Sequence, residues 1–202
     1  MQFKISKELL VQIEQLIHQK NDHELGILLN DLHHADIAEI FDELESEEAI
    51  YIFKLLDSEI TAEILLELED DVREKILRGL SAKEIAEEID ELDTDDAADI
   101  IGELPQSKKE QVISELEDVE HAKDIVDLLR YDEDSAGGLM GKELVKVNEN
   151  WNVLTCVKEM RAQAENVSKV HSIYVVDDEE RLKGRLSLKD LLTTSTKTPI
   201  SD

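Results

Sequence analysis

The sequence lacks the features that stabilise secreted proteins and that span membranes. Cys156 is its one cysteine, so the chain cannot form an internal disulfide, and we expect it to fold in a reducing compartment. No apolar run approaches the roughly 18 residues of a transmembrane helix, and the first residues lack the apolar core of a signal peptide. These absences predict a soluble, cytosolic body.

Basic residues are also scarce. The 202 residues include 22 Lys and Arg against 50 Asp and Glu, for a formal net charge of −28. Residues 1–131 carry −25 of that charge and residues 132–202 carry −3. Such a field repels phosphate backbones and anionic lipid, so we expect no nucleic acid or membrane surface as a partner. Cations are the natural partners.

Leucine recurs in strict register every twelve residues through most of the chain. The ninth residue after each leucine is apolar in all eight copies, and the eighth is Ile or Val except at Glu88 and Asp124. The fifth, eighth, ninth and twelfth positions after each leucine are spaced as i, i+3, i+4 and i+7, which is typical of the apolar face of an amphipathic helix. The nine leucines are Leu32, Leu44, Leu56, Leu68, Leu80, Leu92, Leu104, Leu116 and Leu128.

One continuous helix cannot satisfy this repeat, because twelve residues carry the next leucine about 120° around the helix axis. The helix must break in every unit, and Asp57, Ser81 and Asp93 are suitable N-caps directly after a leucine. Glu84 completes a capping box with Ser81, and Asp96 forms a similar pair with Asp93. The sequence therefore predicts short helices of about nine residues that depend on stacking against their neighbours.

The predicted fold is an α-helical superhelix of helical hairpins, 24 residues per pair, followed by a small α/β unit. The hairpins occupy residues 32–129, and helices at 6–19 and 22–31 open the stack as divergent members. Ser6 is a suitable cap for the first of these. The whole acidic helical-repeat domain spans residues 1–131, with handedness left open.

After residue 131 the pattern changes. Glycines and charges at residues 132–138 predict a hinge, and residues 139–195 predict a β-α-β-β-α unit. A unit of about 55 residues is too small to bury both faces of its sheet, so it needs a partner. Residues 196–202 are interpreted as a linker. The elements expected are a short strand at Leu144, Val145 and Val147, a helix at 151–164, strands at His171–Val176 and Leu182–Leu186 around a turn at 177–180, and a helix at Ser187–Leu192.

Acidic residues at helical spacing are the main functional candidates. Glu59 with Glu63, and Asp95 with Asp99, are four residues apart and share a helix face. Like charges at this spacing cost about 0.2–0.5 kcal/mol per pair, and the repeat unit that begins at Leu92 has no Lys or Arg to offset them. Mg²⁺ and Ca²⁺ take oxygen ligands, so a divalent cation fits this pattern. The alternative is a solvated helix face whose early acids suit the helix dipole.

Other motifs suggest less. The sequence from Gly137 to Lys142 is one residue short of a phosphate loop and is better interpreted as a hinge. Ser187 and Asp190, at the start of a helix after a strand, could hold a phosphate and a ribose, or Ser187 could simply cap that helix. The histidines have no zinc spacing, and Cys156 is expected to be a packed thiol. We find no nucleophile constellation, so we expect no enzymatic activity.

Three stretches together resemble the cytosolic part of the MgtE magnesium transporters. They are the leucine-repeated acidic helices, the segment Tyr131-Asp-Glu-Asp-Ser-Ala-Gly-Gly-Leu-Met140, and the segment Leu182-Lys-Gly-Arg-Leu-Ser-Leu-Lys-Asp-Leu191. The resemblance covers nearly the whole chain. It implies that the helical region is the N domain of that family and that the second region is the first of two CBS motifs.

The resemblance also implies a function. In that family, Mg²⁺ ions bind between acidic N and CBS domains and close the gate of a homodimeric magnesium channel or transporter. It implies N-domain ligands at Glu63, Asp95 and Asp99, and a backbone carbonyl near Gly137 or Gly138. The expected partners are Mg²⁺, a second CBS motif and a transmembrane domain absent from this sequence, and a second copy of the chain. The implied location is the cytoplasmic side of the cell membrane.

Two other functions remain open. The helical stack could be a non-enzymatic scaffold that binds a protein partner, with the acids serving solubility. The CBS-like unit could instead sense adenine nucleotides, although half of a CBS pair supplies only half of a nucleotide cleft.

Overall fold

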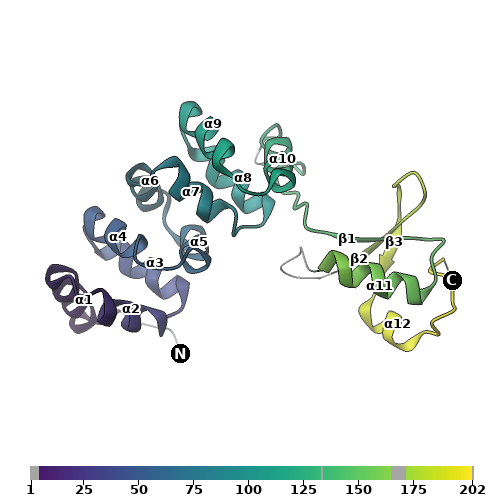
Figure 1. Cartoon of the computed structure of the whole chain (residues 1–202), viewed down its shortest axis with the longest axis horizontal. Helices are drawn as coiled ribbons and strands as arrows, with labels where there is room; N and C mark the ends of the chain where they lie inside the picture. Colours follow the sequence, from purple (N-terminus) through teal and green to yellow (C-terminus); the bar gives the residue numbers. More distant parts are fainter. Residues whose placement is uncertain (1–4, 133, 165–171, 202) are drawn as a thin grey trace. The chain divides into compact units, whose positions relative to one another are not determined.

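The computed structural model describes residues 5–132, 134–164 and 172–201. The chain divides into two compact units, Met1–Leu139 and Met140–Asp202, which are described separately. The first unit is a row of short helices, and the second is a small sheet with two helices (Figure 1). This is the predicted class of architecture. The hinge at 132–138 falls at the end of the first unit.

The first unit contains ten helices in its described residues. The first two, α1 and α2, match the predicted opening helices, and Ser6 caps α1 by accepting a hydrogen bond from the Leu9 amide at 3.1 Å. The helices are α1 (Lys7–Gln19), α2 (Asp22–Asn30), α3 (His34–Glu43), α4 (Ser46–Phe53), α5 (Ser58–Glu67), α6 (Asp70–Gly79), α7 (Ala82–Ile89), α8 (Thr94–Glu103), α9 (Gln106–Glu115) and α10 (Val119–Leu128).

Helix starts follow the repeat, but their caps differ. Asp57, Ser81 and Asp93 all occupy N-cap positions with extended backbone. Ser81 and Glu84 form the predicted capping box, with the Ser81 amide donating to Glu84 at 2.6 Å. The capping pair predicted for Asp93 and Asp96 does not form, since the Asp93 side chain makes no cap hydrogen bond in the described structure. The Asp93 carbonyl accepts the first helical hydrogen bond of α8, from the Ala97 amide at 2.9 Å.

From α3 to α10 each helix packs most closely against a helix two positions away, which gives the predicted 24-residue structural period, whereas α1 packs most closely against α2. The main contacts join α3 with α5, α7 with α9, and α8 with α10, while α4 with α6 and α5 with α7 continue the series. Residues at the eighth and ninth positions of the repeat form much of the core, and the eighth position illustrates how fully they are buried. Six residues at the eighth position are at most 2% exposed: Ile40, Ile52, Ile64, Ile76, Ile100 and Val112.

The second unit contains a three-stranded sheet in the order β1-β2-β3. Strand β1 (Val145–Asn148) pairs in parallel with β2 (Ile173–Val176), and β2 pairs antiparallel with β3 (Leu182–Leu186). Helix α11 (Val153–Gln163) connects β1 to β2, and α12 (Leu188–Thr193) follows β3. The predicted β-α-β-β-α order is confirmed, except that Leu144 precedes β1 and that His171 lies outside the described residues.

The core of this unit is small. It consists of alternate residues of β1 and β2 with Val153 and Cys156 from α11 and Leu191 from α12. Cys156 is fully buried, as expected of a packed thiol, and burial raises its pKa. The segment predicted as a linker packs against the loop before α11: the Ile200 amide donates to the Trp151 carbonyl at 2.8 Å. Across the described residues, every helix is too short or too polar to cross a bilayer.

Candidate functional site

The four predicted metal ligands lie on α5 and α8. Glu59 is in the first turn of α5 and Glu63 is one turn later, and both side chains are exposed. Asp95 is in the first turn of α8 and half-buried, and Asp99 is exposed one turn later. Each pair therefore occupies one face of its helix, as the spacing predicts.

The pKa of Asp96 indicates which of these carboxylates lie within electrostatic range of it. Burial raises its pKa to about 6, and the charges of Asp95, Asp93, Asp99 and Glu63 add to the effect in that order. Asp96 is on α8 and Glu63 is on α5, so carboxylates from both helices lie within electrostatic range of one another. Glu63 is among the charges that raise the pKa of Asp96 but not among those that raise the pKa of Asp99. Glu59 is not among the charges that affect Asp96.

A basic residue from another helix partly balances this cluster. Arg73 on α6 donates to both carboxylate oxygens of Glu103 on α8, with its Nη2 at 2.6 Å from Oε1. Asp99 has a raised pKa, first from burial and then from Asp95 and Glu103, and Arg73 opposes that rise. The sequence unit at Leu92 has no basic residue of its own. Tertiary packing brings Arg73 of α6 to this unit, and the sequence of the unit alone does not indicate that residue.

Asp99 also lines a cavity of about 330 Å³ at the end of the helical stack, within the first unit. Residues of the predicted hinge also line this cavity. In the hinge, Asp132 accepts a hydrogen bond from the Asp134 amide at 3.1 Å, and Ser135 Oγ accepts one from the Gly138 amide at 3.2 Å. Lys109 closes one side by donating to the Gly102 carbonyl at 2.6 Å. The lining residues are Ala98, Asp99, Gly102, Lys109, Leu128, Leu129, Tyr131, Asp132, Asp134 and Gly138.

Gly137 packs closely against Tyr131 within the segment predicted as a hinge. A Cβ at that position would lie 2.3 Å from Cδ1 of Tyr131 and 2.6 Å from its Cγ. Because no real side chain approaches a ring so closely, any larger residue at this position must displace Tyr131 or the turn. The turn therefore keeps Asp132, Asp134 and Gly138 beside Asp99.

The predicted ligands do not form a preformed metal centre. Within residues 5–132, 134–164 and 172–201, no three Asp, Glu, His or Cys side chains converge closely enough to hold a metal ion. Mg²⁺ keeps several waters and is usually held by one or two carboxylates, so a partial ligand set on this chain suits it better than a closed cage would. Sequence spacing identified the acidic faces. It did not define a coordination sphere.

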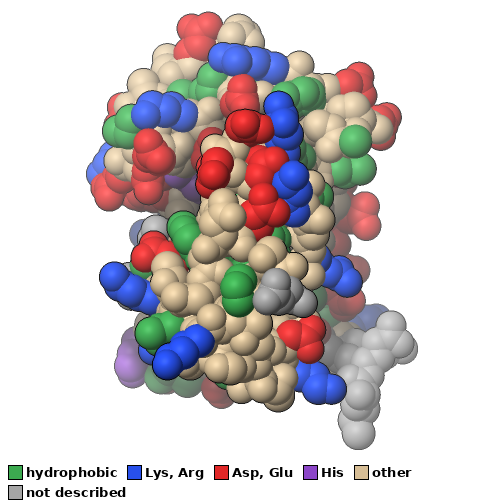
Figure 2. Space-filling model, turned by 90° about the vertical axis from the view of Figure 1, so that its right-hand side faces the viewer, with side chains coloured by type: hydrophobic (Ala, Val, Ile, Leu, Met, Phe, Trp, Pro, Cys, Tyr) green, Lys and Arg blue, Asp and Glu red, His purple; other side chains and the backbone are tan. Residues whose placement is uncertain are grey.

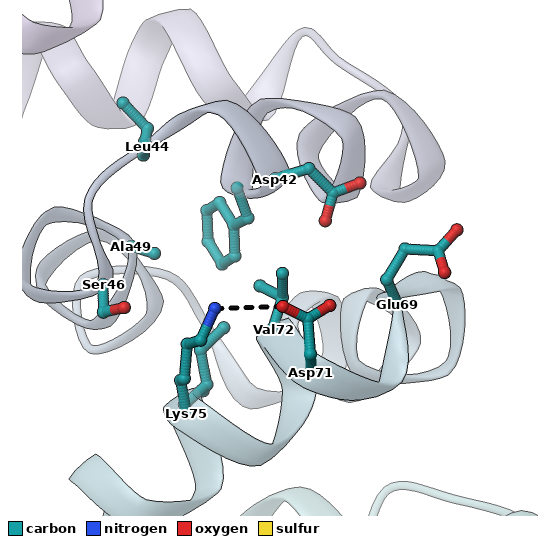
Figure 3. Close-up of a pocket in the computed structure, with 10 residues that line it drawn as sticks. Asp42, Leu44, Ser46, Ala49, Glu69, Asp71, Val72 and Lys75 are labelled. Carbon is teal, nitrogen blue, oxygen red and sulfur yellow. Dashed lines mark hydrogen bonds and ion pairs between the residues drawn. The ribbon is translucent and has the colours of Figure 1, made fainter.

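A second acid-lined cavity of about 310 Å³ lies among α3, α4 and α6 (Figure 3). Asp42 from α3 faces the same space as Glu69 and Asp71 at the start of α6, and Lys75 forms an ion pair with Asp71 at 3.0 Å. Burial, then Glu69 and Asp71, raise the pKa of Asp42. Sequence reasoning missed this group because Asp42 and Asp71 belong to different helices. Its acids are all exposed, so we assign it no role.

The predicted nucleotide residues have different surroundings. Ser187 caps α12, since its Oγ accepts from the Lys189 amide at 3.1 Å and from the Asp190 amide at 3.4 Å. A cavity of about 320 Å³ beside it is lined by Arg185, Ser187 and Lys189 but not by Asp190. Ser187 therefore acts as the N-cap of α12, which is one of the two roles that the sequence suggests for it. The side chains of Arg185 and Lys189, which line the same cavity, are positively charged and could bind a phosphate.

Surface charge is not uniform despite the large net charge. On the face that Figure 2 shows, carboxylates lie among lysines, arginines and exposed apolar side chains. Several basic residues pair with acids on their own helix, such as Lys75 with Asp71 and Arg78 with Glu74. In the acidic cluster of α5 and α8, Asp96 is part-buried among like charges.

Family models match both parts of the chain. Residues 32–134 match the model for the MgtE intracellular N domain, and residues 136–196 match the model for the CBS domain. The first match covers the repeat from Leu32 and ends within the predicted hinge, at residue 134. It includes all four candidate metal ligands.

Curated relatives carry the same name. The magnesium transporter MgtE of Thermus thermophilus is 34% identical over 212 aligned residues, which cover 98% of this chain and 44% of the relative. The magnesium transporter MgtE of Bacillus subtilis is 28% identical, over 96% of this chain and 43% of the relative. The chain thus spans less than half the length of these relatives.

Two solved structures have the same fold. One is the cytosolic domain of the Mg²⁺ channel MgtE in complex with ATP, with a TM-score of 0.84 and 31% identity, covering 96% of this chain and 79% of that one. The other is the soluble part of a magnesium transporter, with a TM-score of 0.75 and 25% identity, covering 96% of this chain and 77% of that one. The architecture is therefore shared with cytosolic regions of magnesium transport proteins.

Proposed function

The chain belongs to the MgtE magnesium transporter family, and from that membership we propose that it is a Mg²⁺-sensing regulatory region. Mg²⁺ bound by the acidic N domain draws that domain and the CBS unit together, and the closed arrangement shuts the gate of a transporter or channel. The relatives named above are magnesium transporters, and this chain matches their N and CBS domains. The gate itself would lie in a transmembrane domain outside this sequence.

One observation carries the proposal: burial raises the pKa of Asp96 to about 6, and the charges of Asp95, Asp93 and Asp99 on α8 and of Glu63 on α5 add to that rise. A divalent cation beside Glu63, Asp95 and Asp99 would neutralise like charges that otherwise repel one another and any further acidic surface. Because the ion stabilises the closed arrangement more than the open one, its concentration sets the balance between them. Glu59, one turn from Glu63 and exposed, would be an outer member of the set.

The remaining ligands would come from elsewhere. The described residues provide no closed set, and Mg²⁺ retains waters, so the Asp132 to Gly138 turn and a second CBS motif are the proposed sources of further oxygens. The chain covers less than half of its relatives, which leaves room for that motif and for membrane helices. A homodimer would place two such sensors on one gate.

The test compares Mg²⁺ with salt alone. Small-angle scattering and limited proteolysis at residues 132–138 are followed from 0 to 10 mM MgCl₂, against KCl of equal ionic strength, concentrations chosen to span roughly the millimolar affinity of weak carboxylate sites. We expect Mg²⁺ to reduce the radius of gyration and to protect the hinge more than KCl does. An equal response to both salts would contradict Mg²⁺ sensing and favour the scaffold function.

The ligand assignment is tested separately. Asp95→Asn/Asp99→Asn should lose most of the Mg²⁺ response, while Glu110→Gln/Glu115→Gln, which removes two exposed acids from α9, should keep it. If both double variants respond like the unaltered protein, sensing could remain but these two residues would not be its ligands.

A second function is favoured by the solved relative that was crystallised with ATP. We infer that the cavity beside Ser187 binds the phosphates of an adenine nucleotide through Arg185 and Lys189. Asp190, which does not line that cavity, stays the ribose partner that the sequence predicts. Titration calorimetry with ATP should give heat that is reduced in Arg185→Ala and unchanged in Arg181→Ala, which removes an exposed arginine outside the cavity. Absence of heat with the unaltered chain would remove this function.

A further inference from the structure

Glu88 is an acid inside the core of the helical stack. It occupies the eighth position of the repeat, where the other buried copies carry isoleucine or valine, and it is 7% exposed. Asp124, the other exception, is only half-buried. A carboxylate at such a position costs free energy unless it is neutral or well paired.

The Glu88 carboxyl joins two helices. Its Oε2 lies 2.6 Å from Oγ1 of Thr61, so the contact links α7 with α5. Thr61 is fully buried, and its Oγ1 also lies 3.1 Å from the Asp57 carbonyl oxygen. When Glu88 is neutral, it can donate to Thr61 while Thr61 donates to Asp57. When Glu88 is ionised, the single Thr61 proton must turn to Glu88, because a carboxylate only accepts.

Other charged groups around Glu88 do not neutralise it. On its own helix, Glu87 and Glu91 add negative charge. Lys54 from the end of α4 is paired with Glu84 at 2.7 Å. On the other side of α7, Lys108 of α9 donates to the Leu77 carbonyl at 3.2 Å and to the Leu80 carbonyl.

Protons can still reach the carboxyl group. Glu88 lines a cavity of about 350 Å³ together with Phe53, Lys54, Leu56, Asp57, Ser58, Leu80, Glu84 and Glu87. Several of these residues are polar, so water can occupy the space. Burial raises the pKa of Glu88 to about 7, the Thr61 hydrogen bond opposes the rise, and Glu87 and Glu91 add to it.

We propose that Glu88 and Thr61 form a proton-dependent contact between α5 and α7, closed when Glu88 is neutral and loosened when Glu88 ionises. Ionisation puts a charge on a side chain that is only 7% exposed, and the Thr61 hydrogen bond offsets only part of the cost of burying that charge. The charged form therefore favours looser packing of α5 against α7, which brings more water to the carboxylate. The rigidity of the stack therefore follows pH near neutrality. This contact does not depend on metal binding.

The direction of the pH effect is unusual for an acidic protein. The pKa of Glu88 is higher in the folded chain than in the unfolded chain, where it has its ordinary value of 4.5. Its contribution to stability is thus complete below pH 4.5 and is lost as pH rises through about 7. Carboxylates held by ion pairs behave in the opposite way.

The experiment compares urea unfolding of the full chain with that of Glu88→Gln from pH 5 to 8.5, at constant ionic strength and with chelator present. The equilibrium constant for unfolding of the unaltered protein, divided by that of Glu88→Gln, should rise about tenfold per pH unit from pH 5 to pH 7 and then level off. The matched control is Glu87→Gln, an exposed neighbour on the same helix, which should keep the profile of the unaltered protein. Parallel profiles for the unaltered chain and Glu88→Gln would overturn the proposal.

A second measurement holds even if Glu88→Gln folds poorly. The carbon-13 shift of the Glu88 carboxyl group in the unaltered protein should titrate with a midpoint near 7, and a midpoint near the ordinary 4.5 would overturn the proposal. Thr61→Val should move that midpoint upward, because the Thr61 bond favours the charged form. If Thr61 only packs, the variant would lower stability without moving the midpoint, which would also overturn the proposal.

Discussion

At the scale of single residues, Arg73 connects three helices that the repeat places in different units. Its guanidinium lies on α6 and donates to Glu103 on α8, to Asp70 at 2.8 Å, and to the carbonyl of Leu68 after α5 at 3.0 Å. The side chain is only 13% exposed, so these hydrogen bonds are shielded from water. Buried, multiple hydrogen bonds of this kind hold helices in register more firmly than surface ion pairs do.

We expect Arg73→Ala to destabilise the chain by about 2 kcal/mol, since it leaves Glu103 and a backbone carbonyl without their donor. It should also raise the pKa of Asp99 further, because Arg73 now opposes that rise. Urea denaturation measures the first effect and a carboxyl titration by NMR measures the second. Arg78→Ala on the same helix removes an exposed i to i+4 pair with Glu74 and should cost less than about 0.5 kcal/mol. Equal losses in the two variants would contradict the role of Arg73.

At the scale of the element, the helices differ in how much room they leave for a side chain. A Cβ at Gly26, inside α2, would have nothing within 4 Å, whereas a Cβ at Gly79, the last residue of α6, would lie 2.5 Å from Cδ1 of Ile50 on α4. Within a helix, glycine lowers the free energy of unfolding relative to alanine, because it loses more backbone conformational entropy on folding. At Gly79 the small residue permits close packing of α6 on α4.

We expect Gly26→Ala to stabilise the chain by about 0.5–1 kcal/mol, as helix propensity predicts where no neighbour interferes. Gly79→Ala should gain less or lose stability, because Ile50 must move. Thermal and urea unfolding of the two variants, measured side by side, test this. A larger gain for Gly79→Ala than for Gly26→Ala would mean that packing between α4 and α6 does not limit that position.

At the scale of the whole molecule, the large net charge predicts electrostatic self-repulsion. The net charge is −28, and most of it falls on the helical repeat. Such repulsion opposes the compact state and is weakened by salt, whose screening length falls from about 30 Å at 0.01 M to about 10 Å at 0.1 M.

Raising KCl from 10 to 100 mM, with chelator present, should therefore increase the melting temperature of the full chain. Each kcal/mol of relieved repulsion corresponds to about 2–4 °C for a chain of this size. Differential scanning calorimetry measures the shift, and sucrose controls for effects unrelated to charge. A melting temperature that is constant or falls with KCl would show that local ion pairs outweigh the net repulsion.

The extent of sequence prediction differs between the fold and the candidate site. The twelve-residue leucine register defined the short helices and their order, because burial of apolar side chains at helical spacing is a local property of the sequence. The pairs Glu59 with Glu63 and Asp95 with Asp99 were also visible, because residues four apart share a helix face. By contrast, the ion pair of Arg73 with Glu103 and the proximity of Asp42 to Asp71 could not be predicted, because about thirty residues separate the two members in each case.

The sequence by itself determined the repeat, the change to a β-α-β-β-α unit and the excess of acid, since each follows from spacing and composition. Only the tertiary structure decided which charges meet. It placed Glu63 near the acids of α8, brought Arg73 to Glu103, and buried Glu88 beside Thr61. The physical reason is that electrostatic and hydrogen-bond energies depend on distance and burial, which are set by how the helices stack and not by their separation along the chain.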